Sequence, residues 1–482
     1  MGLLAVVVGV ALLVGVVVAA TGPDRADGPP VRLEPSAAPA RHEPEQVPDE
    51  GGDPPAQPTE WDARITGLIA FIEQERGLTY DHPVPVDLLA EDEYVEAAGG
   101  DDGSLGFYDG YRIVGRGTDL NPALQGTLVH ELTHVLDDQH FDIFGIEARA
   151  GVSREESVAY AGLVEGDAIR IEAAYDRMLI ASGVDPYDVA DIAATTGPAP
   201  GTPTALDPAG AAVAASRVPA PRGRDLAGAR GVYGWEISSL SDAIDDSPYF
   251  VGEGFLDVLV ENGGNAAVDA AFRDPPVTTE QILDPRTYIA GSGAVAVAPP
   301  EPAAPAGEVE PEASAGALNL YLLLAAGIEP LDALDAVTGW GGESVVSYED
   351  TEGRDCVDLA VVGDTVADTA EIGAAMARWV DTGVAAAAST AQRPDGAQVL
   401  TACGLGDDDA ASDPYDALSL AEARSSHVWA AMRDDGLAAG EAFSFGECVV
   451  HGVDLDTLLA IERSVEAPPG AQAEVDRVAD RC

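Results

Sequence analysis

NPALQGTLVHELTHVLDDQH, residues 121 to 140, is the stretch from which the rest of the chain is interpreted. It contains His130-Glu131-Leu132-Thr133-His134, an H-E-x-x-H pattern. On a helix, side chains at i and i+4 lie only about 40° apart around the axis, so both imidazoles can bind one metal ion. Glu131 projects beside that pair, where a carboxylate can accept a proton from a water molecule that the metal activates. The pattern therefore predicts a zinc site on a helix.

The flanking residues support a helix at this position. Asn121 is a favourable N-cap, and Pro122 suits the first helical position. Apolar residues fall on the face opposite the histidines, which predicts that this face packs into a core while the other faces a cleft. These residues are Leu124, Leu128, Leu132, Val135 and Leu136.

Zinc needs at least a third protein ligand, and the next helix supplies a candidate. Ser153 and Glu156 form a capping box that predicts a long helix to about Met178. Glu165 on this helix is the first choice. Gly162 and Gly166 flank Glu165, and we expect these small residues to let the helix approach the metal helix closely.

His140 is a rival third ligand, because it completes the metzincin spacing H-E-x-x-H-x-x-G-x-x-H. Asp137, however, occupies the position where glycine makes the chain turn sharply. We expect His140 instead to cap the end of the metal helix or to bind a carboxylate that itself contacts the metal ligands. Asp137 and Asp138 are candidates to orient a ligand histidine.

The composition is strongly acidic. The chain has 482 residues, 84 acidic and 25 basic, for a formal net charge of -59, and it contains no lysine. At about 1 M salt the Debye length falls to roughly 3 Å and the self-repulsion is screened, so we expect a protein that folds best in molar salt. Nucleic-acid binding is disfavoured, because no basic stripe could neutralise phosphates. Its length allows two or three domains, and with 46% hydrophobic residues the chain can bury hydrophobic cores.

The N-terminal segment is interpreted as a membrane anchor. Leu3 to Ala20 is uncharged and almost wholly apolar, just long enough to span a bilayer. We favour an uncleaved anchor over a cleaved signal peptide, and in either case the rest of the protein is expected outside the cell. Thr21 to Pro58 is rich in Pro, Ala and acidic residues and is predicted to be an extended tether.

Further predictions concern the remaining chain. Two short strands, Leu105–Tyr108 and Tyr111–Val114, are predicted to form a hairpin whose sheet edge could bind an extended peptide. Tyr249, in an amphipathic helix that starts at Pro248, is a candidate donor to the oxyanion of a peptide-bond hydrolysis.

The four cysteines, Cys356, Cys403, Cys448 and Cys482, are predicted to form two disulfides, with three pairings open.

Five segments resemble, in this order, a family of poorly characterised prokaryotic zinc-metallopeptidase-like proteins that includes surface proteins of halophilic archaea. They are HELTHVLDDQHF (130–141), LVEGDA (163–168), PYFVGEGF (248–255), DPPVTTEQILDP (274–285) and GWGGESVVSY (339–348). The similarity covers roughly Thr59 to Val380. It implies a gluzincin with His130, His134 and Glu165 as zinc ligands and Glu131 as general base. Many gluzincins carry Asp four residues after the ligand Glu, whereas this chain has Ile169 there.

The sequence thus predicts an α+β protein: a mainly helical zincin-like domain with a small sheet, followed by a C-terminal α+β region. The expected boundaries are an anchor or signal at 1–20, a linker at 21–58, the zincin-like domain at 59–292 with a low-complexity insertion at 193–230, a linker at 293–315 and the C-terminal region at 316–482. The predicted function is a membrane-tethered extracellular zinc metallopeptidase acting on peptides or proteins. The alternative is a non-catalytic zincin-fold surface protein with a structural or adhesive role. The oligomeric state stays open.

Overall fold

The computed structural model describes residues 57–99, 104–147, 153–186, 240–302, 309–312, 316–404, 414–462, 468 and 470–482. The fold is α+β, as the sequence predicts, with a three-stranded and a five-stranded sheet. The predicted anchor at Leu3–Ala20, the tether up to residue 56 and the insertion at 193–230 lie outside these residues. Within the described ranges, no helix is both long and apolar enough to cross a membrane.

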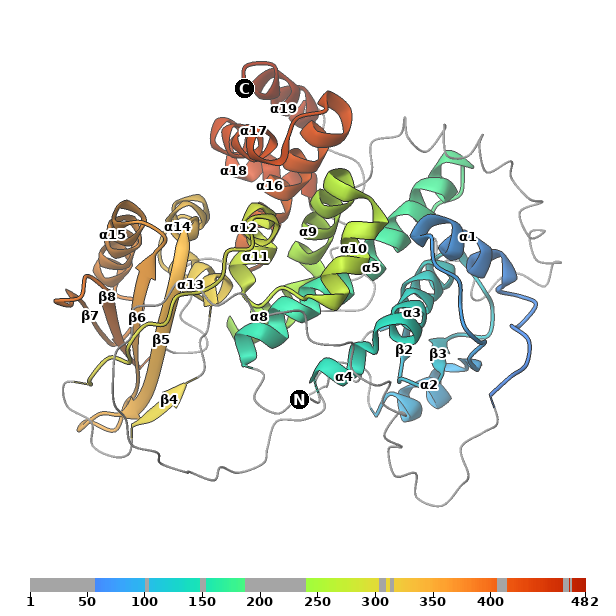
Figure 1. Ribbon diagram of the computed structural model, residues 1–482, viewed down its shortest axis with the longest axis horizontal. Coiled ribbons are helices and arrows are strands. Elements are labelled where there is room, and N and C mark those ends of the chain that lie inside the picture. The colour runs from blue at the N-terminus through green and yellow to red at the C-terminus, as the bar shows by residue number, and fades with distance from the viewer. Residues whose placement is uncertain are drawn as a thin grey trace.

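The N-terminal part combines the small sheet with the two longest helices of the site (Figure 1). The sheet has the order β1-β3-β2, with β1 parallel and β2 antiparallel to β3. The predicted hairpin around Asp109-Gly110 is therefore confirmed. The elements are α1 (Thr66–Arg76), β1 (Val86–Leu89), α2 (Glu91–Ala97), β2 (Gly106–Tyr108), β3 (Ile113–Arg116), α3 (Pro122–Phe141), α4 (Ile143–Glu147) and α5 (Arg154–Ala181).

Short helices cover α5 on its other side, between the small sheet and the C-terminal part (Figure 1). Among them α9 makes the most extensive contact with α5 and also packs against α16 (Pro414–Asp435). Thr278 caps α11 by accepting a hydrogen bond from the Gln281 N–H. The helices are α8 (Leu240–Asp246), α9 (Pro248–Gly263), α10 (Asn265–Arg273), α11 (Thr279–Leu283) and α12 (Pro285–Ala290).

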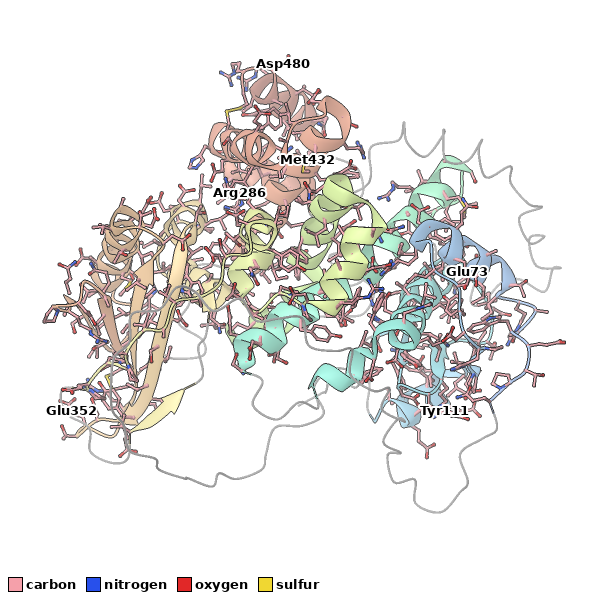
Figure 2. The ribbon with its side chains drawn as sticks, viewed as in Figure 1. Glu73, Tyr111, Arg286, Glu352, Met432 and Asp480 are labelled. Carbon is pink, nitrogen blue, oxygen red and sulfur yellow. A yellow bond between two sulfur atoms is a disulfide. The ribbon has the colours of Figure 1, made fainter. Side chains whose placement is uncertain are left out.

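The C-terminal part is a five-stranded sheet of order β4-β5-β6-β8-β7, helices beside it, and a final helical group (Figure 1). Arg286 on α12 lies over the Phe443 ring of α17 at 3.5 Å, where the central and final helices meet (Figure 2). The elements are β4 (Glu310–Glu312), α13 (Gly316–Ala325), α14 (Pro330–Val337), β5 (Trp340–Glu349), β6 (Asp355–Gly363), α15 (Val366–Thr382), β7 (Ala387–Gln392), β8 (Gln398–Cys403), α16 (Pro414–Asp435), α17 (Ala439–Gly452), α18 (Leu455–Glu462) and α19 (Ala471–Ala479).

The two predicted disulfides form, and the structure gives their pairing. Cys356 is bonded to Cys403 and Cys448 to Cys482. Cys356 and Cys403 are direct cross-strand partners of β6 and β8, so the first disulfide joins two neighbouring strands of the sheet. The second joins α17 to the last residue of the chain.

Two hydrophobic clusters hold α3 and α5 in place. One is formed by α1, α3 and the C-terminal half of α5, and it includes Leu128 and Leu132, both fully buried. Full burial of one such leucine contributes about 1.5–3 kcal/mol. The other cluster extends from the N-terminal half of α5 through α9 to the C-terminal sheet and helices. Because α5 contributes to both clusters, its position relative to α3 and α9 is fixed from two sides.

Candidate metal centre

The helix α3 begins and continues as its sequence predicts. The Asn121 side chain accepts a hydrogen bond from the Leu124 N–H at 2.8 Å, and Pro122 occupies the first turn. The five apolar residues predicted on the core face are all buried. The helix ends at Asp142, a non-glycine residue in the left-handed region with φ 57°. Asp142, and not His140, is therefore the C-cap residue.

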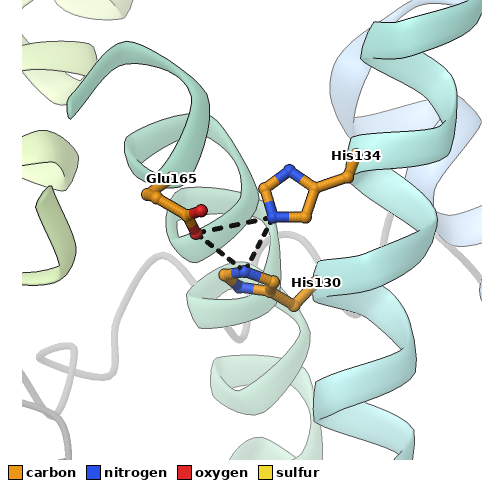
Figure 3. Close-up of side chains that lie close together, drawn as sticks. All are labelled: His130, His134 and Glu165. Atoms are coloured by element: carbon orange, nitrogen blue, oxygen red, sulfur yellow. Dashed lines mark hydrogen bonds and ion pairs between the residues drawn. The ribbon is translucent and has the colours of Figure 1, made fainter. Parts of the chain in front are cut away.

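His130, His134 and Glu165 converge on one point, as Figure 3 shows. His130 Nε2 lies 3.0 Å from His134 Nε2 and 3.2 Å from Glu165 Oε2, and His134 Nε2 lies 3.4 Å from the same oxygen. The histidines come from α3 and the glutamate from the facing helix α5. The structure thus brings together all three residues predicted as ligands, and this group could hold a metal ion.

The size of this triangle fits a tetrahedral zinc ion. With ligand bonds of about 2.0–2.1 Å, the edges of a tetrahedron around zinc measure about 3.3–3.4 Å. The three sides of 3.0, 3.2 and 3.4 Å are close to that edge length. Two imidazole nitrogens and one carboxylate oxygen are also a typical donor set of catalytic zinc. The residues present therefore fit zinc in both geometry and chemistry.

His140, the rival ligand, lies elsewhere. Its Nε2 is 2.9 Å from the Thr79 carbonyl oxygen on an exposed surface. The expectation that His140 caps the metal helix or binds a carboxylate is wrong, because Asp142 is the C-cap residue of α3 and His140 contacts the Thr79 carbonyl oxygen instead. Glu165 is the third member of the cluster.

Asp137 and Asp138, the carboxylates expected to orient a ligand histidine, also lie away from the cluster. Asp137 is fully buried in a charged network with Arg76, 3.5 Å away. Asp138 accepts a hydrogen bond from the Tyr108 hydroxyl at 2.9 Å, and burial raises the pKa of Asp138 to about 6. No hydrogen bond to a ligand histidine is found for either residue within the described part of the chain.

Glu172 makes the contact with a ligand histidine that was predicted for Asp137 or Asp138. Its Oε2 lies 3.2 Å from His130 Nδ1. Glu172 is seven residues after Glu165, two helical turns along the same face of α5, so that spacing was a signal available in the sequence. Gly126 lies one turn before His130, and a Cβ there would be 3.4 Å from Glu172 Oε1, about van der Waals contact. An acceptor at Nδ1 fixes the tautomer in which Nε2 is free to bind a metal.

The electrostatics of the cluster suit a cation. Burial alone would lower the pKa of His130, but hydrogen bonds to Glu165 and Glu172 raise it well above its usual value. Burial alone would raise the pKa of Glu165, but the two imidazoles lower it. The carboxylates thus hold positive charge at the point where the three donor atoms meet.

Glu131 lies beside the cluster and is 7% exposed. Burial raises the pKa of this carboxyl, while His130 and His134 oppose the shift. The backbone of Tyr108, the last residue of β2, also opposes the rise in the pKa of Glu131. The side chain predicted as general base therefore lies near the end strand of the small sheet.

Tyr249, the predicted oxyanion donor, is also at the cluster. Its ring stacks near that of His130, with centroids 6.5 Å apart and planes at 23°. Burial raises the pKa of the phenol well above its usual value, and the nearby Glu165 and Glu131 carboxylates, with a hydrogen bond to Glu165, add to the shift. The phenol therefore keeps its proton and can donate it in a hydrogen bond.

Comparisons with known proteins do not add to this description. No protein-family model matches the chain. Neither a characterised protein nor a solved structure matches it. The interpretation of the site therefore rests on the residues and their geometry.

Proposed function

We propose that this chain is a zinc-dependent peptidase held at the outer face of a membrane by its N-terminal segment. The observation that carries the proposal is the triangle of His130 Nε2, His134 Nε2 and Glu165 Oε2, with sides of 3.0–3.4 Å, beside the buried Glu131. A zinc ion bound by these atoms supplies Lewis-acid activation of water and of the substrate carbonyl.

In this proposal, each neighbouring residue has a separate task. Glu131 accepts a proton from the attacking water and passes it to the leaving amine, a task for which a carboxyl with a raised pKa is suited. The Tyr249 hydroxyl donates a hydrogen bond to the oxyanion that forms from the carbonyl. Glu172 keeps His130 in the tautomer that binds through Nε2.

The end strand β2 is the proposed binding edge for the substrate backbone. The Leu105 carbonyl accepts a hydrogen bond from the Arg116 N–H of β3, and the Asp109 N–H donates one to the Arg112 carbonyl directly before β3, so the backbone groups of Gly106 and Tyr108 point to the opposite side. The Tyr108 backbone is near enough to Glu131 to lower the pKa of its carboxyl. An extended peptide that pairs with this edge would have its backbone next to the proposed base.

The test combines metal analysis with Glu131→Gln. The wild type purified in molar salt should contain one zinc ion per chain, and His134→Ala should abolish binding. Glu131→Gln should keep the zinc and lower the cleavage of a mixed peptide library by about 10²-fold or more. If wild type and Glu131→Gln both hold zinc and cleave equally poorly, the protein is a non-catalytic zincin-fold surface protein.

A further inference from the structure

The helices α5 and α9 touch backbone to backbone at three glycines. A Cβ built on Gly166 would lie 2.4 Å from the Gly252 carbonyl oxygen, and a Cβ on Gly252 would lie 2.4 Å from the Gly162 oxygen. All three residues have ordinary helical dihedral angles, since none is among the positive-φ glycines. The glycines are therefore required by the close approach of the helices and not by backbone strain. The prediction that Gly162 and Gly166 bring α5 close to the metal helix is wrong, because Gly166 faces Gly252 of α9 and a Cβ on Gly162 would meet the Ile282 side chain of α11.

This contact lies directly beside the candidate metal centre. Gly166 follows Glu165 in α5, and Gly252 is one helical turn after Tyr249 in α9. The close approach therefore determines how near the phenol comes to Glu165 and how its ring lies against His130, 6.5 Å away. A side chain at position 252 would have to push α9 away from α5, because the obstructing atoms belong to the backbone.

We propose that Gly252 is a positioning residue for Tyr249: its lack of a side chain sets the distance of the phenol from the metal centre. The inference rests on the proposed function for the role of Tyr249, but the placement itself can be tested without catalysis. Gly254 offers a matched control on the same helix, because a Cβ there would lie 2.4 Å from the Ser425 Cβ of α16. Both substitutions disturb the packing of α9, but only one affects its contact with α5.

The first experiment follows the phenol by ¹⁹F NMR of protein labelled with 3-fluorotyrosine, with Tyr249→Phe to assign its resonance. Adding zinc should shift the Tyr249 signal in the wild type and in Gly254→Ala. In Gly252→Ala the zinc-induced shift should fall by at least half, while zinc is still bound. A full wild-type shift in Gly252→Ala would overturn the inference, whether or not the protein cleaves peptides.

The second experiment is a double-mutant cycle on peptide cleavage. Tyr249→Phe and Gly252→Ala should each lower kcat by about 10- to 100-fold with little change in KM, because the phenol acts in the transition state. The double variant should be no slower than Tyr249→Phe alone, whereas Gly254→Ala should combine with Tyr249→Phe additively. Additive losses for Gly252→Ala would mean that it acts on the fold in general and would contradict the inference.

Two further outcomes are informative. If the wild type cleaves nothing but the NMR result holds, the proposed function fails and the placement of Tyr249 stands. If Gly252→Ala does not fold, Leu256→Val perturbs the same contact more mildly, since the Leu256 side chain lies over Gly166. It should reduce the zinc-induced Tyr249 shift while Gly254→Ala retains it, and an undiminished shift would contradict the inference.

Discussion

Glu172 shows how a single carboxylate can determine the tautomer and the ring orientation of a histidine that could bind a metal ion. It lies 3.2 Å from His130 Nδ1, on the ring atom opposite to the one that faces His134 and Glu165. We expect Glu172→Gln and Glu172→Ala to weaken zinc binding by about 10- to 100-fold, with the larger loss for alanine, because the ring orientation and basicity are no longer supported.

Zinc affinity can be measured by competition with a chromophoric chelator in molar salt. Glu371→Gln on the exposed face of α15 removes the same charge far from the site and is the control. An affinity of Glu172→Ala within twofold of that control would show that His130 does not depend on Glu172.

The sequence predicted the site residues whose positions follow from helical geometry. The i, i+4 spacing of His130 and His134 fixes their common direction, and Glu165 was found because one more ligand was needed on the next helix. The spacing of Glu165 and Glu172 places both on one face of α5, but the sequence does not specify how α3 rotates against α5 and therefore whether Glu172, or Asp137 and Asp138, meets His130. Asp137 faces the buried Arg76 instead, a partner 61 positions earlier in the chain.

Among the elements, α1, α3, α5 and α10 are connected behind the site by Arg76. Its guanidinium is fully buried and lies 2.6 Å from Asp167, 2.6 Å from Asp269 and 3.5 Å from Asp137. Removing one partner of a buried network leaves uncompensated charge and typically costs 3–5 kcal/mol.

We therefore expect Arg76→Ala to lower the free energy of unfolding by about 3–5 kcal/mol. Arg64→Ala is the matched control, since Arg64 is 50% exposed and pairs with Asp62 in the loop before α1. An exposed pair contributes about 1 kcal/mol or less. Urea denaturation of both variants gives the comparison, and equal losses would show that the buried network contributes no more than a surface pair.

Glu155 connects the start of α5 to α11. It accepts hydrogen bonds from the Thr279 N–H at 2.6 Å and from the Thr279 hydroxyl at 3.0 Å, and that hydroxyl in turn accepts one from the Leu318 N–H of α13. Burial raises the pKa of Glu155 to about 8; the Thr279 N–H opposes this, and the nearby Glu343 adds to it.

The raised pKa of Glu155 predicts a pH dependence of stability. The folded protein keeps this proton up to a pH of about 8, whereas the unfolded chain releases it near the ordinary value of 4.5. Stability should therefore fall as pH rises between these values, by at most about 1.4 kcal/mol per pH unit for one proton. Glu280, whose pKa burial also raises to about 8, adds a slope of the same sign.

Glu155→Gln should flatten this decline, because the amide remains neutral at every pH. Thermal unfolding midpoints between pH 5 and 8.5 in molar salt provide the measurement. A decline in Glu155→Gln as steep as in the wild type would mean that Glu155 is already ionised in the folded protein.

The elements themselves were predictable where caps and periodicity were strong. The capping box of Ser153 and Glu156 starts α5, and Gly77 ends α1 in the left-handed conformation. The start of α1 at Thr66 has no such signal, because its N-cap residue is Ile65 and no side chain caps the helix. The sequence did not predict the strand β7, Ala387–Gln392, because its small and polar residues show no apolar alternation. Only its pairing with β8 places it in the sheet.

For the whole molecule, we expect the charge to determine the conditions under which the fold is stable. With 84 acidic and 25 basic residues, folding brings a large excess of carboxylates together. The buried Arg76 network is one of the few places where basic side chains neutralise several acids at once. At most other positions the repulsion has to be screened by ions, because arginines are too few to pair with all carboxylates.

The thermal unfolding midpoint should therefore rise steeply with KCl up to about 1 M, where the Debye length falls to roughly 3 Å, and more slowly above it. Choline chloride at the same concentrations should give a similar rise, since screening depends on ionic strength and not on the identity of the cation. Sucrose, which is excluded from protein surfaces but carries no charge, should give only the weaker stabilisation of an osmolyte. An intact fold by circular dichroism in salt-free buffer, with a midpoint that KCl does not raise, would show that the acidic surface is tolerated without screening.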